Sequence, residues 1–256
     1  MIKNKKIIVV IPAYNAEKTL ARTYSEIPGE VPDKVILVDD GSKDGTLKAA
    51  EKLKIQIIKH SKNKGYGAAL KTGFSHALKM NPDIIIVLHS DNQYPPKLLK
   101  DIALPVADND YDLVLASRFL GRSPLKEGMP AFRYFSNKFL TFIQNITFGC
   151  GLAEYHTGYR AYNAKILRYI PYEINSDDFV FDNELFSQIF YFKHRITEIT
   201  CPAVYSSETS SINFTGSVKF GIKVLITCLK FIMHKYKIKN SILYHRKQLN
   251  NQGDTL

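Results

Sequence analysis

Short apolar runs alternate with amphipathic segments in the first half of the chain, and this alternation constrains the fold more than any other feature. The apolar runs occupy residues 7–11, 34–38, 55–58, 83–88 and 112–116. Helical patterns lie between them at residues 17–27, 46–53, 68–80 and 96–107. Continuous apolar runs are typical of strands that are buried on both faces of a parallel sheet. We therefore expect an α/β protein of three layers with a mostly parallel central sheet.

The second half of the chain is less regular, although 256 residues with 45% hydrophobic content can bury a sizeable core. Helical patterns at residues 132–148 and 182–192 precede a late strand at residues 196–204. No linker rich in Pro, Gly or Ser separates the two halves. We expect one domain over residues 1–214 and a basic amphipathic extension over residues 215–256.

Composition indicates the cellular compartment and the class of partner. Three widely spaced cysteines without a CxxC pair suggest neither a disulfide framework nor a zinc ribbon, which favours a reducing cytoplasm. No apolar run of about 18 residues is present, so no membrane-spanning helix is expected. The net charge of +11 and pI near 9.4 indicate an anionic partner. Nucleic acid is not expected, because no aromatic–basic motif of a known type occurs.

Polar side chains follow every apolar run of the first half. The segments are PAYN at residues 12–15, DDGS at 39–42, NKGYG at 63–67, HSDNQ at 89–93 and SR at 117–118. In sheets of this kind, ligands bind beyond the carboxyl ends of the strands. One such segment is commonly only a turn or a helix cap, but five that converge on one edge predict a binding site.

The segment HSDNQ is a candidate metal site. In an extended segment, side chains at alternate positions share one face, so His89, Asp91 and Gln93 are expected to project together. A divalent cation held by one or two protein groups and completed by phosphate oxygens is the usual arrangement for Mg²⁺. A polar turn before a helix that starts at Pro96 is the equally weighted alternative.

With these motifs in order, the chain resembles the family-2 glycosyltransferases, which have the GT-A fold, and among them the dolichol- or polyprenyl-phosphate sugar synthases. The matching segments are VVIPAYN, VILVDDGSKDGT, NKGYGAALKTGF, SDNQYPP, ASRF and HTGYRAYN. Each segment is weak alone, whereas the ordered set is specific. The resemblance implies a UDP- or GDP-sugar donor, a divalent cation, either Mg²⁺ or Mn²⁺, and a lipid-phosphate or glycan acceptor.

The resemblance also implies roles for particular residues. Pro12, Tyr14 and Asn15 would bind the donor near its nucleobase, and Asp39 and Asp40 would contact the base or ribose. The metal ligands would be Asp91, Gln93 and, less typically, His89. The arginines that would face phosphates are Arg118, Arg133 and Arg160, a role that suits the planar, permanently charged guanidinium. Asp91, Arg118 and Asp182 would take part in catalysis.

Three departures from the family pattern stand out. Relatives commonly have Asp-x-Asp where this chain has His89-Ser90-Asp91, and many have Glu where it has Ala16. Relatives that use phosphoprenols usually carry basic residues in the loop after the late strand. Here that loop is SSETSSINF, residues 206–214, without a basic residue.

The family chemistry is transfer with inversion, and the acceptor decides whether a general base is needed. A lipid phosphate is already ionised near neutral pH, because its second pKa is roughly 6. A sugar hydroxyl needs a carboxylate to take its proton, and Asp178, Asp182 and Glu184 are the candidates. In the alternative interpretation, Asp182 caps a helix and Glu184 complements its dipole.

Three functions therefore stay open. The first is a metal-dependent transferase with a lipid-linked acceptor, and the second is a transferase to a glycan hydroxyl in cell-surface polysaccharide synthesis. The third is a sugar-nucleotide-binding protein that lost catalysis together with the first Asp of the motif. A test for donor hydrolysis or transfer with Mn²⁺ separates the third from the others.

The C-terminal helix predicted at residues 218–237 indicates where in the cell the protein is located. Lys219, Lys223, Lys230, His234 and Lys237 fall on one stripe of it, and apolar residues cover the rest. Such a helix suits a membrane interface, which predicts a cytoplasmic protein bound peripherally to the inner face of the membrane. Docking on a membrane-protein partner or on the protein's own core are the alternatives.

Overall fold

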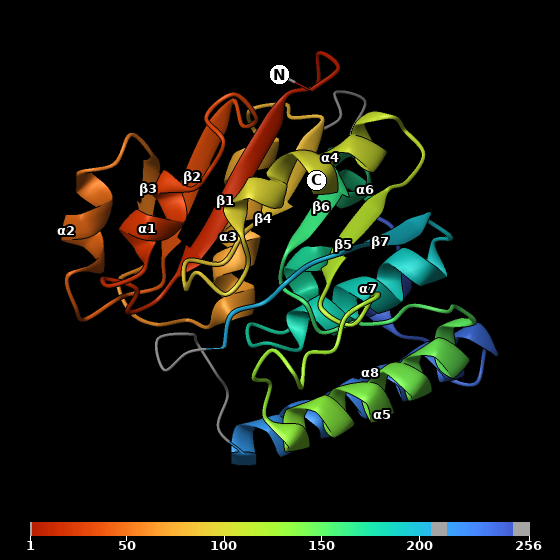
Figure 1. Cartoon of the computed structure of the whole chain (residues 1–256). Coiled ribbons are helices and arrows are strands. Elements are labelled where there is room, and N and C mark those ends of the chain that lie inside the picture. The colour runs from red at the N-terminus through yellow and green to blue at the C-terminus, as the bar shows by residue number, and fades with distance from the viewer. Residues whose placement is uncertain (1, 206–213, 248–256) are drawn as a thin grey trace.

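A seven-stranded sheet forms the middle layer in a computed structural model, which describes residues 2–205 and 214–247 (Figure 1). The strand order is β3-β2-β1-β4-β6-β5-β7. The strands are β1 (Ile7–Ala13), β2 (Lys34–Asp39), β3 (Gln56–Lys59), β4 (Ile84–Val87), β5 (Leu113–Ser117), β6 (Arg160–Asn163) and β7 (Ile196–Thr200). Among them β6 alone runs antiparallel to its neighbours. The expected three-layer fold with a mostly parallel sheet is confirmed.

Helices cover both faces of the sheet, which explains why its strands are continuously apolar. Along β1, Ile8 and Val10 join one core cluster, while Ile7, Val9 and Ile11 join the cluster on the opposite face. The first cluster lies under α3 (Tyr66–Leu78), α6 (Ala164–Tyr169) and α7 (Phe181–Tyr191). The second lies under α1 (Leu20–Ser25), α2 (Thr46–Glu51) and α4 (Leu99–Ala107).

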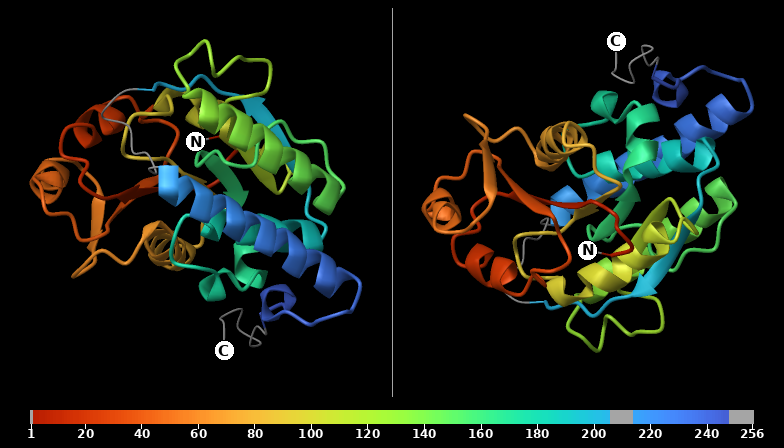
Figure 2. Two further views of the ribbon diagram at one scale, coloured as in Figure 1. Left: turned by 90° about the horizontal axis from the view of Figure 1, so that it is seen from below. Right: turned by 90° about the horizontal axis from the view of Figure 1, so that it is seen from above.

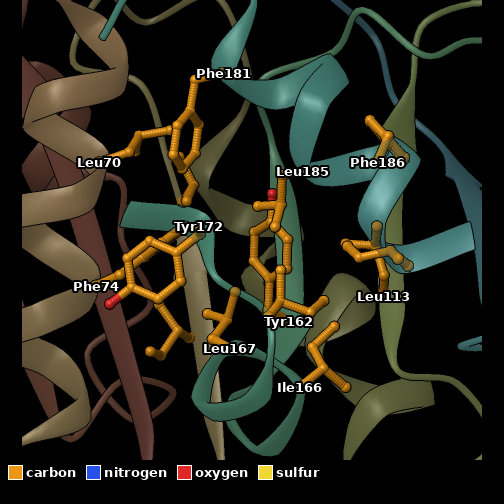
Figure 3. Close-up of a cluster of buried hydrophobic side chains, with 14 of the residues drawn as sticks. Leu70, Phe74, Leu113, Tyr162, Ile166, Leu167, Tyr172, Phe181, Leu185 and Phe186 are labelled. Atoms are coloured by element: carbon orange, nitrogen blue, oxygen red, sulfur yellow. The ribbon is translucent and has the colours of Figure 1, made fainter. Parts of the chain in front are cut away.

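The larger of these clusters ties the two halves of the chain together. Figure 3 shows Phe74 of α3 beside Tyr172, with Phe181 and Leu185 of α7 and Tyr162 of β6 packed around them. The ring centroids of Phe74 and Tyr162 are 5.5 Å apart and meet edge to face, a favourable aromatic geometry. The irregular second half is therefore part of the same hydrophobic core as the first.

Two long helices, α5 (Ala131–Phe148) and α8 (Phe214–Lys235), lie side by side below the carboxyl edge of the sheet (Figures 1 and 2). Leu140, Val180 and Val224 join them to α7. Cys228 and Phe231 of α8 belong to the main core cluster. One face of the C-terminal extension thus docks on the protein's own body. No described helix is both long and apolar enough to cross a membrane.

Short helical turns complete the described chain, and some elements differ from expectation. The turns are η1 (Pro96–Leu98), η2 (Tyr172–Ile174) and η3 (Ile242–Tyr244). The late strand ends at Thr200 rather than at residue 204, since Pro202 has no N–H to donate to a sheet. Strand β6 was not predicted, because its four residues begin with a buried Arg and show no apolar run.

Candidate active site

A cavity of about 530 Å³ lies at the carboxyl edge of the sheet and extends between α5 and α8. Most of the predicted site residues line it, namely Pro12, Tyr14, Asp40, His89, Asp91, Gln93, Arg118, Arg133, Arg160 and Asp182. Because β6 is antiparallel, its first residue, Arg160, lies at the edge where the parallel strands end. The fold therefore brings together residues that are up to 170 positions apart in the sequence.

Asn15 and Asp39 do not line this cavity and instead shape the loops beside it. The backbone N–H of Ser42 donates to both Asp39 carboxylate oxygens, at 3.3 Å each, and Asp39 is fully buried. The N–H of Lys43 donates to Asn15 Oδ1 at 2.9 Å. A direct contact of either residue with a donor stays a prediction.

Asp40 lines the cavity and anchors the glycine-containing loop before α3. Its carboxylate accepts from the backbone N–H of Lys64 at 2.9 Å and of Gly65 at 2.8 Å. His60 Nδ1 lies 2.7 Å from the same carboxylate. Gly65 has a φ of 104°, and a Cβ there would lie 2.4 Å from the carbonyl oxygen of Asp177. The glycine therefore lets this loop approach the segment that leads into α7.

The HSDNQ segment does not continue β4 as an extended strand. Asn92 has a left-handed φ of 57°, and the N–H of Gln93 donates to Asp91 Oδ1 at 3.1 Å, which closes a turn. The expectation that His89, Asp91 and Gln93 share the face of an extended strand is therefore wrong. All three still line the cavity, because the turn folds over its edge.

His89 belongs to a buried polar chain that sequence reasoning missed. Tyr66 donates its hydroxyl proton to Asp182 Oδ2 at 3.1 Å, and His89 Nε2 lies 3.1 Å from the same hydroxyl oxygen. Since Tyr66 has one proton to give, Nε2 of His89 must be the donor in the second bond. Burial lowers the pKa of His89, which keeps the imidazole neutral.

Asp182 and Arg160 form a buried ion pair inside the protein. Arg160 Nη1 lies 2.7 Å from Asp182 Oδ1. Its Nε donates to the carbonyl oxygen of Thr157 at 2.7 Å, and Nη2 donates to that of Tyr155 at 3.2 Å. Asp182 does not cap its helix, because α7 begins after Val180. Arg160 thus contacts one carboxylate and two backbone carbonyl groups in the chain, and it also lines the cavity, so its predicted role of facing a phosphate stays a prediction.

Arg118 forms a second buried ion pair, with Glu154, which the sequence did not single out. Arg118 Nε donates to Glu154 Oε1 at 2.9 Å, and the amide of Asn137 donates to the same oxygen at 2.9 Å. Burial opposes ionisation of Glu154, but the Arg118 charge and the hydrogen bonds outweigh it and lower the pKa of the carboxyl. Arg118 is therefore fixed in one orientation at the edge of the cavity.

The oxygen-bearing side chains in the cavity fit a divalent cation that a substrate also coordinates. The described residues include no group of three His, Cys, Asp or Glu that could hold a metal by themselves. Asp91 and Gln93 bring two oxygen-bearing side chains to the cavity wall. Such a partial set is what Mg²⁺ uses when substrate phosphates complete its coordination.

Comparison with known proteins identifies the class. Residues 8–170 match the profile described as "Glycosyl transferase family 2". The chain belongs to glycosyl transferase family 2 and is a glycosyltransferase. An uncharacterized protein of Methanocaldococcus jannaschii is 31% identical over 91% of this chain and 94% of its own length.

Two relatives carry names that describe an activity. The UDP-N-acetylglucosamine–dolichyl-phosphate N-acetylglucosaminyltransferase of Methanococcus voltae is 27% identical over 91% of this chain and 98% of its own length. The polyprenol monophosphomannose synthase of Mycolicibacterium smegmatis is 25% identical over 71% of each chain. The crystal structure of glucosyl-3-phosphoglycerate synthase from Mycobacterium tuberculosis in complex with UDP superposes with a TM-score of 0.70. The two sequences are 18% identical, the alignment covers 95% of this chain and 86% of the synthase chain, and both have the GT-A fold.

Proposed function

We propose that the protein transfers a sugar from a UDP- or GDP-sugar to a polyprenyl-type lipid phosphate, with inversion at the anomeric carbon. The shape and lining of the cavity carry this proposal. The loops at the sheet edge contribute the polar groups of Asp91 and Arg118, while α5 and α8 contribute apolar side chains that include Phe132, Leu140 and Phe220. An acceptor with a phosphate head and a hydrocarbon tail matches both sets of side chains.

The names of the relatives support a lipid-phosphate acceptor. Proteins named for transfer to dolichyl phosphate and undecaprenyl phosphate align with 91% and 76% of this chain. A mycobacterial enzyme of the same fold was solved with Mn²⁺ and UDP, which supports a nucleotide-sugar donor and a divalent cation. The low identity to that enzyme leaves the choice between UDP and GDP to experiment.

Asp91 and Gln93 are the residues that would hold the cation. When bound, the cation would neutralise charge that develops on the diphosphate leaving group. His89 is the weakest of the three predicted ligands, because its Nε2 is engaged with Tyr66. Its neutral imidazole instead connects the turn that carries Asp91 to Asp182.

The surroundings of Asp182 fit a phosphate acceptor better than a hydroxyl acceptor. An ionised phosphate attacks without a general base, so Asp182 can serve to hold Arg160 and Tyr66 in place. We expect Asp182→Asn to lower kcat less than about tenfold, whereas loss of a general base would lower it by about a hundredfold or more. Single-turnover rates, measured below the melting temperature of the variant, distinguish these outcomes.

The experiment that tests the proposed function has two stages. A melting-temperature screen of UDP- and GDP-sugars, with Mg²⁺ and Mn²⁺ separately, identifies the donor, because a ligand stabilises the fold that binds it. Transfer from that donor to farnesyl phosphate is then compared with transfer to farnesol. Transfer to farnesol alone would replace the proposal by a hydroxyl acceptor. Donor binding without hydrolysis or transfer would favour a sugar-nucleotide-binding protein.

We also propose that the protein binds the inner membrane surface through α5 and α8. Four residues on one stripe of α5, Phe135, Phe139, Phe142 and Ile146, are 57–65% exposed. On α8, Ile222 and Leu229 are 53% and 55% exposed. Lys219 and Lys230 border the exposed stripe of α8, and these cations favour an anionic lipid surface. This surface lies beside the mouth of the cavity.

A further inference from the structure

His156 lies in the cavity wall at the junction between its polar and apolar ends. Its backbone carbonyl accepts from Arg118 Nη2 at 3.1 Å, and its ring meets that of Phe220 edge to face with centroids 5.5 Å apart. Arg118 belongs to the polar end, and Phe220 of α8 belongs to the mouth. His156 therefore contacts a residue from the sheet edge and a residue from α8 within the same cavity wall.

Two arginines hold the backbone of this segment in place. The carbonyl groups of Tyr155 and Thr157 accept from Arg160, and the carbonyl between them, that of His156, accepts from Arg118. Three consecutive carbonyl groups are thus bound to two guanidinium groups, which are themselves buried in ion pairs. The backbone on either side of the imidazole is thus held by the two buried ion pairs.

Both ring nitrogens of His156 are buried, and neither has a hydrogen-bond partner among the residues that the structure describes. Buried polar atoms without partners destabilise a fold, and they are rare unless a ligand or water provides the partner. The nearest carboxylate that acts on the imidazole electrostatically is Glu154, whose oxygens are occupied by Arg118 and Asn137. Because His156 lines the cavity, a ligand bound there can supply the missing partner.

We propose that His156 is a positioning residue that donates a hydrogen bond to the phosphate of the acceptor lipid. A neutral imidazole has one N–H to donate, and an ionised phosphate oxygen accepts such a bond. The position beside Phe220 places a phosphate head at the junction while its hydrocarbon chain leaves between α5 and α8. The inference rests on the proposed lipid-phosphate acceptor and adds the residue that recognises its headgroup.

The test compares how substitutions of His156 change the KM for the acceptor and the KM for the donor. His156→Phe keeps a flat ring but removes the N–H, so the KM for farnesyl phosphate should rise by about tenfold to a hundredfold, the range for a lost bond to a charged group. The KM for the nucleotide sugar should stay within about twofold. His156→Gln, which retains an N–H donor, should recover part of the acceptor affinity. His245→Phe, an exposed histidine outside the cavity lining, is the matched control.

An unchanged KM for farnesyl phosphate in a folded His156→Phe protein would overturn the inference and leave the proposed function intact. Equal increases in both KM values would also overturn it, because they would assign His156 to the donor or to the fold. Absence of transfer to farnesyl phosphate by the wild-type protein would overturn the proposed function together with the inference. Equilibrium binding of farnesyl phosphate, measured in parallel, gives the same comparison for a variant that has lost turnover.

Discussion

At the scale of single residues, the site depends on close approaches that no motif shows. Gly158 touches the ring of His89, since a Cβ at Gly158 would lie 2.1 Å from His89 Nε2. Gly158 thereby allows His89 to reach Tyr66 and the Asp182 carboxylate. Gly158 of the segment HTGYRAYN thus contacts His89 of the strand-end segment HSDNQ.

Gly158→Ala should therefore damage the site rather than only the loop. The added methyl group overlaps a buried ring, and overpacking of this kind destabilises a fold by about 1–3 kcal/mol. Displacement of His89 should also lower kcat/KM by about tenfold or more. Gly151→Ala is the control, because nothing lies within 4 Å of a Cβ there, and it should change the unfolding free energy by less than about 0.5 kcal/mol. Similar behaviour of the two variants in urea unfolding and kinetics would contradict this coupling.

His156 also makes the stability of the protein depend on pH. Burial lowers its pKa from 6.5 to about 4, because the charged form is poorly solvated. Between these two values the unfolded chain binds the proton and the folded chain does not, so stability falls as the pH falls from 6.5 to 4. The loss at the acid end is up to about 3 kcal/mol.

Urea unfolding at pH 7 and at pH 4.5 measures this effect. His156→Phe should lose less stability over this interval than the wild-type protein, since it lacks the group that must be protonated. Other buried groups, including Asp182 with its raised pKa, titrate in both proteins and cancel in the comparison. Identical pH dependence in the two proteins would show that His156 is solvated in the folded state.

At the scale of elements, α8 carries two apolar faces rather than one. Val224, Cys228 and Phe231 are buried against the body, while Val218, Ile222, Leu225, Ile226 and Leu229 are 38–55% exposed. The lysines at 219, 223 and 230 separate the two faces, and Lys223 forms an ion pair with Asp178. Docking on the protein's own core therefore leaves a second face of the helix to meet another surface.

Negative charge introduced on the exposed apolar faces should abolish flotation with liposomes that contain anionic lipid. We expect this result for Phe139→Glu combined with Leu229→Glu, because both side chains are more than half exposed on the proposed membrane surface. The melting temperature should change little, as neither residue is part of the core. Leu104→Glu, at an exposed position of α4, is the matched control and should float like the wild-type protein. Unaltered flotation of the double variant would refute membrane docking by this surface.

At the scale of the whole molecule, the C-terminal segment completes the fold. Val224, Phe231, Leu243 and Tyr244 are at most 5% exposed and pack on residues of the first 200 positions. Burial of each large apolar side chain contributes about 1.5–3 kcal/mol, and a whole domain is stable by only about 5–15 kcal/mol.

A chain that ends at residue 213 should therefore unfold or aggregate rather than remain a folded transferase. Differential scanning calorimetry should show the cooperative transition lost or shifted down by tens of degrees, on the order expected for several kcal/mol. A truncated chain that melts like the full-length protein would show that residues 215–256 are a separate extension. The point variants on α5 and α8 are for this reason the better test of membrane binding.

The predictability of the site differed from one position to the next. Asp40 and Arg118 follow strands directly, and Asp91 lies in the loop after β4, so strand ends alone predicted their place at the cavity. Tyr66, Glu154 and His156 lie on a helix and in a loop, where no periodic pattern marks them. Their importance comes from contacts across the fold, and a buried carboxylate such as Glu154 is recognisable only when its arginine is found beside it.

The sequence by itself determined the α/β class, the mostly parallel direction of the strands and the family, because strand burial on two faces and ordered motifs are local properties of the chain. Tertiary structure decided the rest. It inserted β6 between β4 and β5, brought His89 within hydrogen-bonding distance of Tyr66, and paired Arg160 with Asp182. These outcomes depend on which distant groups meet in a buried, weakly solvated space, where each charge and polar atom requires a partner.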